Sequence, residues 1–458
     1  MATILIDPFP ATGHYNGSLH LANRLREAGH SVVYTGIPQY QEKVQCEGYQ
    51  FYPFFDDPLL NRKIIGNFRY RLDSFISIFN NICLKNALKT TEQYDTLIEK
   101  IKPDIILLDV YQIHKSVIYG KYPVRTIGFD TRVASSYAPN VPPYSSAYIP
   151  KNSFLSGKYV DRLWFLSDCR VLYRIFRDKI LYFNNDLFSI YRKIAAINNV
   201  RLAKWKAVQR IAILRIVPEN LVELVLTPKS FDFPRSETEQ LMYIEPYINK
   251  RDTSEISERY LFTRNYILDL KKKQPDVKFI YASIGTVSAN APKHEARFIR
   301  ALTDYCSKYN AHQIVFSIGK HYNMDALKSI PESIHIFDSV PQLDILQYCD
   351  LMITHGGTNS LIECVLNEVP VIVYPLLTGK TSFDQNGNAA RVVYHQIGIR
   401  EKISRMTAKS LHKNIGKICS HYEFYKRNIK SMKEKISLEA TSNRAITIIE
   451  SFLNKTEI

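Results

Sequence analysis

Two residues of the amino-terminal half have the types and positions that a general base needs. His14 follows Gly13 in the turn-rich segment PATGHYNG, and Asp109 lies at the end of the apolar run PDIILLDV. Both belong near the carboxyl ends of predicted strands, where an open parallel sheet binds its ligands. A histidine whose Nδ1–H is held by a carboxylate keeps Nε2 free to accept a proton. Spacing alone favours a structural interpretation, in which both residues serve as helix caps or bind backbone.

A second group of polar residues lies within 338–390. The run LMIT predicts a buried strand, HGGTNS follows as a turn, and LIECVLN has helical spacing. A glycine turn between a strand and a helix N-terminus holds phosphate, because free N–H groups and the helix dipole face the anion. Thr358 and Ser360 supply hydroxyls there, His355 a ring N–H, and Glu363 a carboxylate that can accept from a ribose hydroxyl pair. The alternative is an ordinary strand-to-helix turn with a capping hydroxyl.

The elements that must position these residues alternate between short apolar runs and stretches of helical spacing, which predicts parallel sheets with helices on both faces. Strands are predicted at 2–9, 31–36, 103–110, 122–129, 221–228, 276–288, 312–319, 333–340, 351–354 and 369–375. Between the first two strands we expect a helix with Ser18 as its N-cap and Gly29 at its end. Residues 72–101 also have helical spacing, whereas 130–150, rich in Pro, Ser and Tyr, predict a loop.

Composition narrows the class of protein. The 458 residues suit two or three domains, and the 45% hydrophobic and 23% charged content is that of a globular protein. Seven scattered cysteines without a Cys-x-x-Cys pair suit a reduced cytoplasmic protein with neither a disulfide framework nor a zinc site. The amino terminus has no signal-peptide pattern, and no apolar run approaches the length of a membrane span.

The net charge of +16 is unevenly distributed. Residues 151–215 hold 14 Lys or Arg against four Asp or Glu, interleaved with aromatic and aliphatic residues at helical spacing. The simplest interpretation is a set of amphipathic helices with a solvated basic face. A basic amphipathic helix with aromatics also suits an anionic membrane surface. We expect no nucleic-acid partner, since no recognisable nucleic-acid-binding module is present.

The stretch 338–390 resembles the donor-binding signature of the family 1 glycosyltransferases (UDP-glycosyltransferases), in particular the bacterial type that acts on natural products and macrolides. That signature reads Pro-Gln, His-x-Gly-x-Asn-Ser, Glu, Val-Pro, Pro and Asp-Gln. The matching residues here are Pro341, Gln342, His355, Gly357, Asn359, Ser360, Glu363, Val369, Pro370, Pro375, Asp384, Gln385 and Asn388. Many special residues in one order over about fifty positions make a specific match.

The resemblance implies roles for both groups of residues. His14 would be the general base and Asp109 the residue that orients it. The nucleotide-sugar donor would contact Ser283, Gly285, Thr286, Val340, Gln342, His355, Gly356, Gly357, Thr358, Asn359, Ser360, Glu363, Asp384 and Gln385. Three departures stand out. Gly17 replaces a usual Pro, Ser339 replaces the Trp that stacks on uracil in plant members, and the loop before Asp384 is longer than usual.

The fold implied by the resemblance is α/β of the GT-B type, with two doubly wound Rossmann-like domains facing across a cleft. We expect an acceptor-binding domain over 1–248, a linker over 249–262, a donor-binding domain over 263–435, and a closing helix over 436–458 that packs back on the first domain. The implied function is transfer of a sugar from a UDP-sugar, with inversion at the anomeric carbon, and glucose is the sugar expected before any other. The implied acceptor is a hydroxyl of a small hydrophobic natural product such as a flavonoid, other phenol, terpenoid or macrolide. Neither a metal nor another cofactor is expected.

Two alternatives remain open. One is a transferase that acts on lipid at a membrane surface through 151–215. The other is a protein that binds a nucleotide-sugar without catalysis. For the main interpretation we expect a cytoplasmic enzyme, and for the first alternative one that is peripheral to a membrane.

Overall fold

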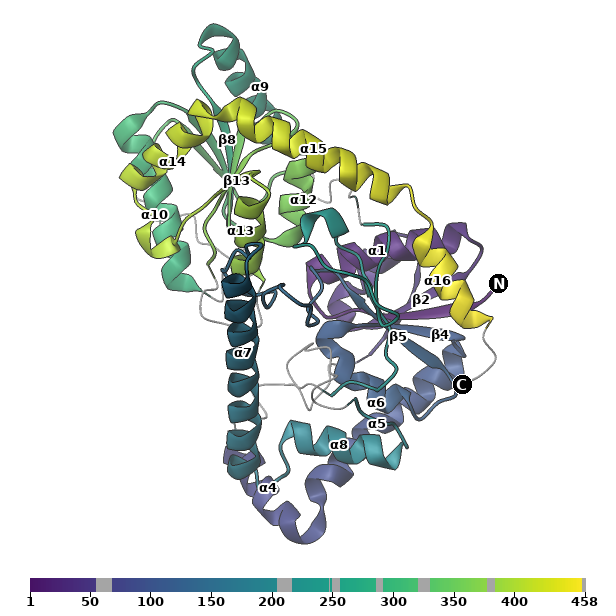
Figure 1. The fold of residues 1–458 in the computed structure, drawn as a ribbon. Coiled ribbons are helices and arrows are strands. Elements are labelled where there is room, and N and C mark those ends of the chain that lie inside the picture. Colours follow the sequence, from purple (N-terminus) through teal and green to yellow (C-terminus); the bar gives the residue numbers. More distant parts are fainter. Residues whose placement is uncertain are drawn as a thin grey trace.

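The protein contains two parallel sheets, each covered by helices (Figure 1). The structure is a computed structural model, and it describes residues 1–54, 68–203, 216–246, 248, 256–285, 291–319, 330–376 and 384–454. The strand order is β3-β2-β1-β4-β5-β6-β7 in the first sheet and β10-β9-β8-β11-β12-β13 in the second. Both orders reverse direction along the chain, as in a doubly wound fold.

Seven strands form the first sheet. They are β1 (Thr3–Asp7), β2 (Ser31–Gly36), β3 (Gln50–Pro53), β4 (Ile105–Asp109), β5 (Arg125–Asp130), β6 (Glu223–Val225) and β7 (Leu241–Tyr243). Alternate side chains of β1 enter different cores, with Ile4 and Ile6 on one face and Leu5 on the other. Because both faces are buried, the strands are apolar throughout, which is why their runs could be recognised in the sequence.

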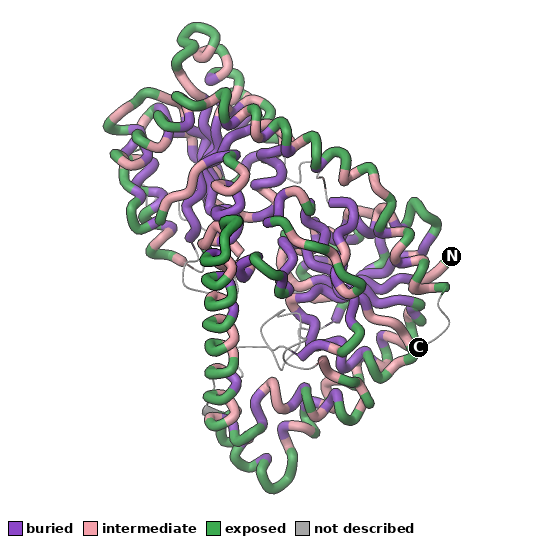
Figure 2. The backbone as a smooth tube through the Cα atoms, viewed as in Figure 1, coloured by how far each residue is buried: buried purple, intermediate pink, exposed green. Residues whose placement is uncertain are grey.

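Six strands form the second sheet. They are β8 (Phe279–Ser283), β9 (Gln313–Ser317), β10 (Ile334–Phe337), β11 (Leu351–Thr354), β12 (Val371–Val373) and β13 (Gly398–Arg400). In the centre of this sheet β11 pairs with both β8 and β12. Figure 2 shows the two buried regions as separate clusters of strands.

Helices cover both faces of each sheet. Those of the first half are α1 (Thr12–Glu27), α2 (Gln41–Cys46), α4 (Phe68–Asn80), α5 (Ile82–Ile101), α6 (Ser116–Tyr119), α7 (Phe154–Leu181) and α8 (Leu187–Ile197). Those of the second half are α9 (Glu258–Lys273), α10 (Pro292–Tyr309), α11 (Gln342–Leu346), α12 (Thr358–Leu366), α13 (Gln385–Tyr394), α14 (Ala408–Ser420), α15 (Tyr422–Ala440) and α16 (Arg444–Leu453).

The start of α1 corrects a prediction. The helix begins at Thr12, so Ser18 lies inside it, buried, and donates from Oγ to the Tyr15 carbonyl at 3.0 Å instead of capping the helix. His14 therefore sits in the first helical turn and not in a loop. Gly17 is tolerated because it lets the helix approach its neighbour: a methyl group there would lie 2.8 Å from Thr131 Cγ2. The helical prediction over 72–101 was right in type, but Asn81, at a φ of 54°, separates α4 from α5.

A buried ion pair joins the two halves of the chain. Asp232, after β6, accepts from Arg391 of α13, with an Nη2–Oδ1 distance of 2.6 Å and both side chains fully buried. Arg235 lies 3.1 Å from the other carboxylate oxygen, which also accepts from the Tyr243 hydroxyl at 2.7 Å. Although burial acts to raise it, the two guanidinium groups hold the pKa of Asp232 below its usual value. The pair therefore fixes α13 to the first sheet's half of the molecule.

The last helices cross between the two halves (Figure 1). α15 packs its buried side chains into the second core, whereas Ala445 and Ile449 of α16 belong to a core of the first sheet. The predicted 249–262 linker overlaps the start of α9 at Glu258, so residues 258–262 are helical; residues 249–255 lie outside those that the structure describes. The other domain boundaries stay predictions.

Candidate active site

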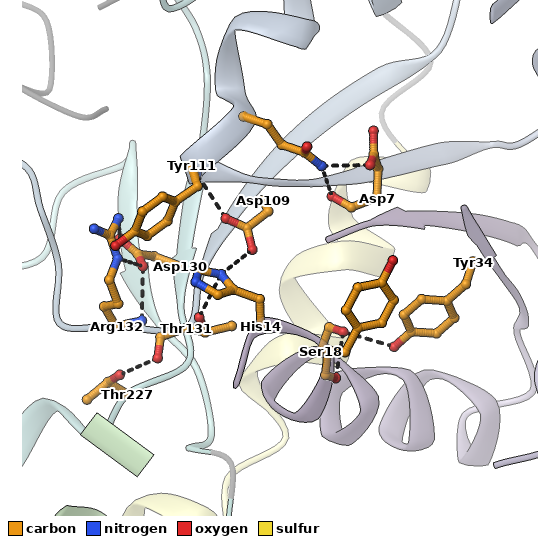
Figure 3. Close-up of polar contacts among 12 residues, drawn as sticks. Asp7, His14, Ser18, Tyr34, Asp109, Tyr111, Asp130, Thr131, Arg132 and Thr227 are labelled. Carbon is orange, nitrogen blue, oxygen red and sulfur yellow. Dashed lines mark hydrogen bonds and ion pairs between the residues drawn. The ribbon is translucent and has the colours of Figure 1, made fainter. Parts of the chain in front are cut away.

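The structure brings His14 and Asp109 together. His14 Nδ1 lies 2.7 Å from Asp109 Oδ2 and 3.2 Å from Thr131 Oγ1, while Asp109 Oδ1 accepts from the Tyr111 backbone N–H at 2.9 Å (Figure 3). Asp109 closes β4 and His14 lies in the first turn of α1, so the strand edge positions both. Since Nδ1 faces the carboxylate, Nε2 is the nitrogen that can accept a proton from a ligand.

The two partners differ in burial, and only the histidine reaches solvent. The Asp109 side chain is 1% exposed and the His14 ring 13% exposed. Two rings pack on the imidazole, Phe9 at 5.2 Å and Tyr111 edge-on at 4.7 Å between centroids. The orientation of the His14 ring is therefore fixed by contacts on several sides, while an edge remains accessible.

A buried pair beside the histidine was not predicted from the sequence. The Arg132 guanidinium donates to both oxygens of Asp130 at 3.0 and 3.1 Å and stacks over the Tyr111 ring, 3.7 Å from its centroid. Burial raises the pKa of Tyr111 well above its usual value, so its phenol stays neutral. The signal in the sequence was the end of the predicted strand 122–129, which puts Asp130, Thr131 and Arg132 at the same sheet edge as Asp109.

The donor-like turn has the predicted form. Gly357 precedes α12 as its N-cap in an extended conformation, and His355 lies between β11 and that helix. Gly285, at a φ of +70°, packs against the His355 ring, where a methyl group would lie 2.3 Å from Cε1. Burial lowers the pKa of His355 to about 4, so its imidazole is neutral at neutral pH.

Side chains around this turn form two hydrogen-bonded groups. Gln342 Nε2 donates to Ser360 Oγ at 3.1 Å and to a carboxylate oxygen of Glu363. Asp384 Oδ2 accepts from Thr358 Oγ1 at 2.7 Å and from Asn388 Nδ2 at 2.9 Å. The first group is preorganised beside the helix start, and the second ties the start of α12 to that of α13.

The two groups of predicted residues face each other between the halves of the molecule. A methyl group at Gly13 would lie 3.8 Å from Asn359 Nδ2. A pocket nearby is lined from both sides, by Gly17, Thr131, Leu226, Thr227 and Pro228 of the first half and by Thr358, Asn359, Ile362, Glu363 and Leu366 of the second. The site is therefore built by both sheets.

Four predicted donor contacts need separate mention. The Val340 side chain is buried in the second core, so only its backbone is left for a ligand. Gln385 accepts from the Leu376 backbone N–H at 2.8 Å, and Ser283 Oγ accepts from the Gly285 N–H at 3.4 Å. Thr286 lies outside the described residues.

Lowering the pH from 7.5 to 5 should reduce the free energy of unfolding by about 2 kcal/mol through His355 alone. The unfolded imidazole takes up a proton below about pH 6.5, whereas the buried one resists until about pH 4. Between pH 6.5 and pH 4 the unfolded state therefore binds more protons than the folded state, so the free energy of unfolding decreases as the pH is lowered. Urea denaturation of the wild type and of His355→Gln at both pH values isolates this contribution. An equal pH dependence in both proteins would contradict it.

Among the described residues no group of three or more His, Cys, Asp or Glu side chains could hold a metal ion. In the same part of the chain, no helix combines the length and the apolar character needed to cross a bilayer.

Comparison with known proteins gives consistent matches. Residues 274–436 match the family model described as UDP-glucoronosyl and UDP-glucosyl transferase. NDP-glycosyltransferase YjiC of Bacillus subtilis (strain 168) is 26% identical over 451 residues, covering 98% of this chain and 97% of the relative. The solved glycotransferase of kitacinnamycin has a TM-score of 0.69 at 20% identity, over 98% of both chains. Spinosyn rhamnosyltransferase SpnG complexed with thymidine diphosphate has a TM-score of 0.61 at 16% identity, over 98% of this chain and 100% of SpnG.

Two parallel sheets that build one site between them, in the arrangement of these solved structures, define the GT-B glycosyltransferase fold. The second half of the chain matches this family model, and a curated NDP-glycosyltransferase aligns over nearly the whole length, so the chain is similar to family 1 glycosyltransferases in sequence as well as in fold.

Proposed function

We propose that the protein transfers a sugar from a nucleoside diphosphate sugar to a hydroxyl of a small hydrophobic natural product, and that UDP-glucose is the first donor to test. The observation that carries this proposal is the 2.7 Å contact between His14 and Asp109 beside the phosphate-type turn of α12. The relatives support a nucleotide-sugar donor: YjiC is named an NDP-glycosyltransferase, and SpnG holds thymidine diphosphate.

The acceptor side of the reaction rests on the first half of the chain. His14 Nε2 takes the proton of the acceptor hydroxyl as the oxygen attacks the anomeric carbon. Asp109 holds the ring and stabilises the imidazolium that forms. An alcohol is a weak nucleophile, so a positioned base accelerates the step by about 10²–10⁴-fold. Attack opposite the leaving diphosphate inverts the anomeric centre, which turns an α-linked donor into a β-glycoside.

The donor side rests on the second half. Negative charge develops on the departing diphosphate, and the first N–H groups of α12 with Thr358 and Ser360 stabilise it electrostatically. Glu363 accepts from the ribose hydroxyls, and Asp384 and Gln385 hold the sugar. Charge stabilisation by helix N–H groups and a neutral His355 gives a reaction that needs no metal, and saturating EDTA should leave the rate unchanged.

The Glu363→Gln substitution should raise the KM for the donor about tenfold to a hundredfold, because a hydrogen bond to a charged acceptor is worth about 1.5–3 kcal/mol. The kcat at saturating donor should change little, since the ribose is remote from the reacting carbon. Glu368→Gln is the matched control, because Glu368 follows the same helix but pairs with Lys433 at the surface. An unchanged KM in Glu363→Gln would remove Glu363 from the donor site.

The function itself is tested by incubating the protein with UDP- and TDP-sugars and a panel of flavonoids, terpenoids, macrolides and lipids, with product detection by mass. Anomeric proton couplings of the product give the stereochemistry. Tight donor binding without turnover on any acceptor would favour a non-catalytic nucleotide-sugar-binding protein instead.

None of the seven cysteines, all within the described residues, forms a disulfide, which supports a cytoplasmic location.

A further inference from the structure

Two helices of the first half expose an unusual amount of apolar surface. We call α4 and α7, with residues 182 and 183, the arm; in Figure 1 α7 runs along one side of the molecule down to α4. The rings of Phe75 and Phe183 lie 5.3 Å apart, so the two helices meet at one end. The exposed large apolar side chains of the arm are Leu72, Phe75, Ile76, Ile78, Phe79, Phe154, Leu155, Tyr159, Phe165, Leu166, Leu172, Tyr173, Phe176, Ile180 and Phe183.

These side chains are not core residues of the chain. Helix α7 has its own inner stripe, Ser156, Val160, Trp164 and Ile175, which is buried. Trp164 anchors that stripe by donating from Nε1 to the Val141 carbonyl at 2.7 Å. The opposite side is exposed along the whole helix (Figure 2), with Phe154 77% and Phe165 66% exposed. Contiguous exposed apolar surface on this scale marks an interaction site.

Charge on the outer side of α7 has one dominant sign. At helical spacing, the exposed residues Lys158, Arg162 and Arg170 lie among the apolar side chains. Asp161 stands at the edge of this band, and Asp168 is half-buried towards the protein. Arg177 also faces outward but is paired with Asp178 at 2.6 Å. The outer side of α7 therefore combines rings with cations.

We propose that the arm docks on the surface of an anionic lipid bilayer, with α7 lying along the headgroups. Aromatic and aliphatic side chains enter the interface while lysine and arginine reach lipid phosphates, which is the pattern of an interfacial helix. A second copy of this chain is a poorer occupant, because two such faces would bring the cations of α7 against each other. The proposal goes beyond glycosyl transfer and does not depend on it.

Co-sedimentation with vesicles tests this docking. The wild type should bind vesicles of phosphatidylcholine and phosphatidylserine at roughly 2:1, bind phosphatidylcholine alone much less, and lose binding at high salt. Replacing Lys158, Arg162 and Arg170 by Glu should weaken binding to the mixed vesicles at least about tenfold, since each cation near the surface adds about 1 kcal/mol. Phe165→Ser with Phe176→Ser should weaken binding to both kinds of vesicle.

Matched controls lie on α15, which Figure 1 places away from the arm. Arg427, Lys430 and Lys435 are exposed there, and replacing them by Glu changes the net charge by the same amount as the triple substitution on α7. Leu438→Ser removes an apolar side chain that is 74% exposed and is the control for the two Phe→Ser substitutions. Equal losses in the α15 variants, or no binding of the wild type to mixed vesicles, would overturn the proposal. So would self-association of the wild type that the ring substitutions abolish while vesicle binding is absent.

Discussion

Replacing His14 by alanine should lower kcat for glycosyl transfer by about 10²–10⁴-fold, because the acceptor hydroxyl then loses its proton without a positioned base. The KM for the donor should stay close to the wild-type value, since the predicted donor contacts lie on the second half of the chain. Steady-state kinetics with any acceptor found in the panel measures both constants. Asp109→Asn should give a smaller loss in kcat, because the ring remains but its orientation and the stabilisation of its charged form weaken.

The control for this experiment is His412→Ala. His412 is exposed on α14 in the other half, where its ring stacks on Tyr309 at 4.0 Å. It should leave kcat unchanged. If His14→Ala turns over donor and acceptor at the wild-type rate, His14 is not the base, and the 2.7 Å contact with Asp109 is structural.

Asp232→Asn should reduce the free energy of unfolding by about 3–5 kcal/mol. The amide is nearly isosteric, so the loss comes from leaving the buried guanidinium groups of Arg391 and Arg235 without a counter-charge. Chemical denaturation measures it as a lower midpoint. Because Arg391 lies on α13 and Asp232 in the other half, the variant should also lower activity by loosening the two sides of the site.

An exposed pair provides the comparison. Asp269 and Lys272 of α9 form a 2.9 Å ion pair in solvent, and such pairs contribute little to stability because water and salt screen them. Asp269→Asn should therefore shift the denaturation midpoint little. If Asp232→Asn also shifted the midpoint only slightly, the pair between Asp232 and Arg391 would make no net contribution to the free energy of unfolding.

The strands could be predicted because their chemistry is local. Parallel strands buried on both faces are continuous apolar runs, and β1, β4, β8 and β11 all fall inside predicted ranges. The start of α1 could not be predicted in this way. Gly13 and Gly17 resemble loop residues, yet both lie inside α1, and Gly17 is a glycine because Thr131 of the neighbouring segment leaves no room for a side chain there. That reason is a tertiary contact, which local patterns do not contain.

In the site too, features with a local sequence pattern could be predicted, and features that depend on tertiary contacts could not. The turn before α12 and the strand-end position of Asp109 were visible as motifs, and the structure brings His14 and Asp109 into contact. The Asp130–Arg132 pair and its stacking on Tyr111 were missed, because their position at a strand end was the signal in the sequence and no motif singles them out. The interdomain pair of Asp232 and Arg391 joins residues 159 positions apart and cannot be inferred from one sequence.

The position of α16 has a consequence for how the protein is made. The backbone N–H of Ala445 donates to Glu245 at 2.9 Å across 200 positions, and Ala445 and Ile449 complete a core that begins with β1. A ribosome adds about 5–20 residues per second. The first half must therefore wait about 10–40 seconds, with the apolar side chains that contact α16 uncovered, while the intervening 200 residues are synthesised. During this interval the nascent chain exposes apolar surface that makes it prone to aggregation.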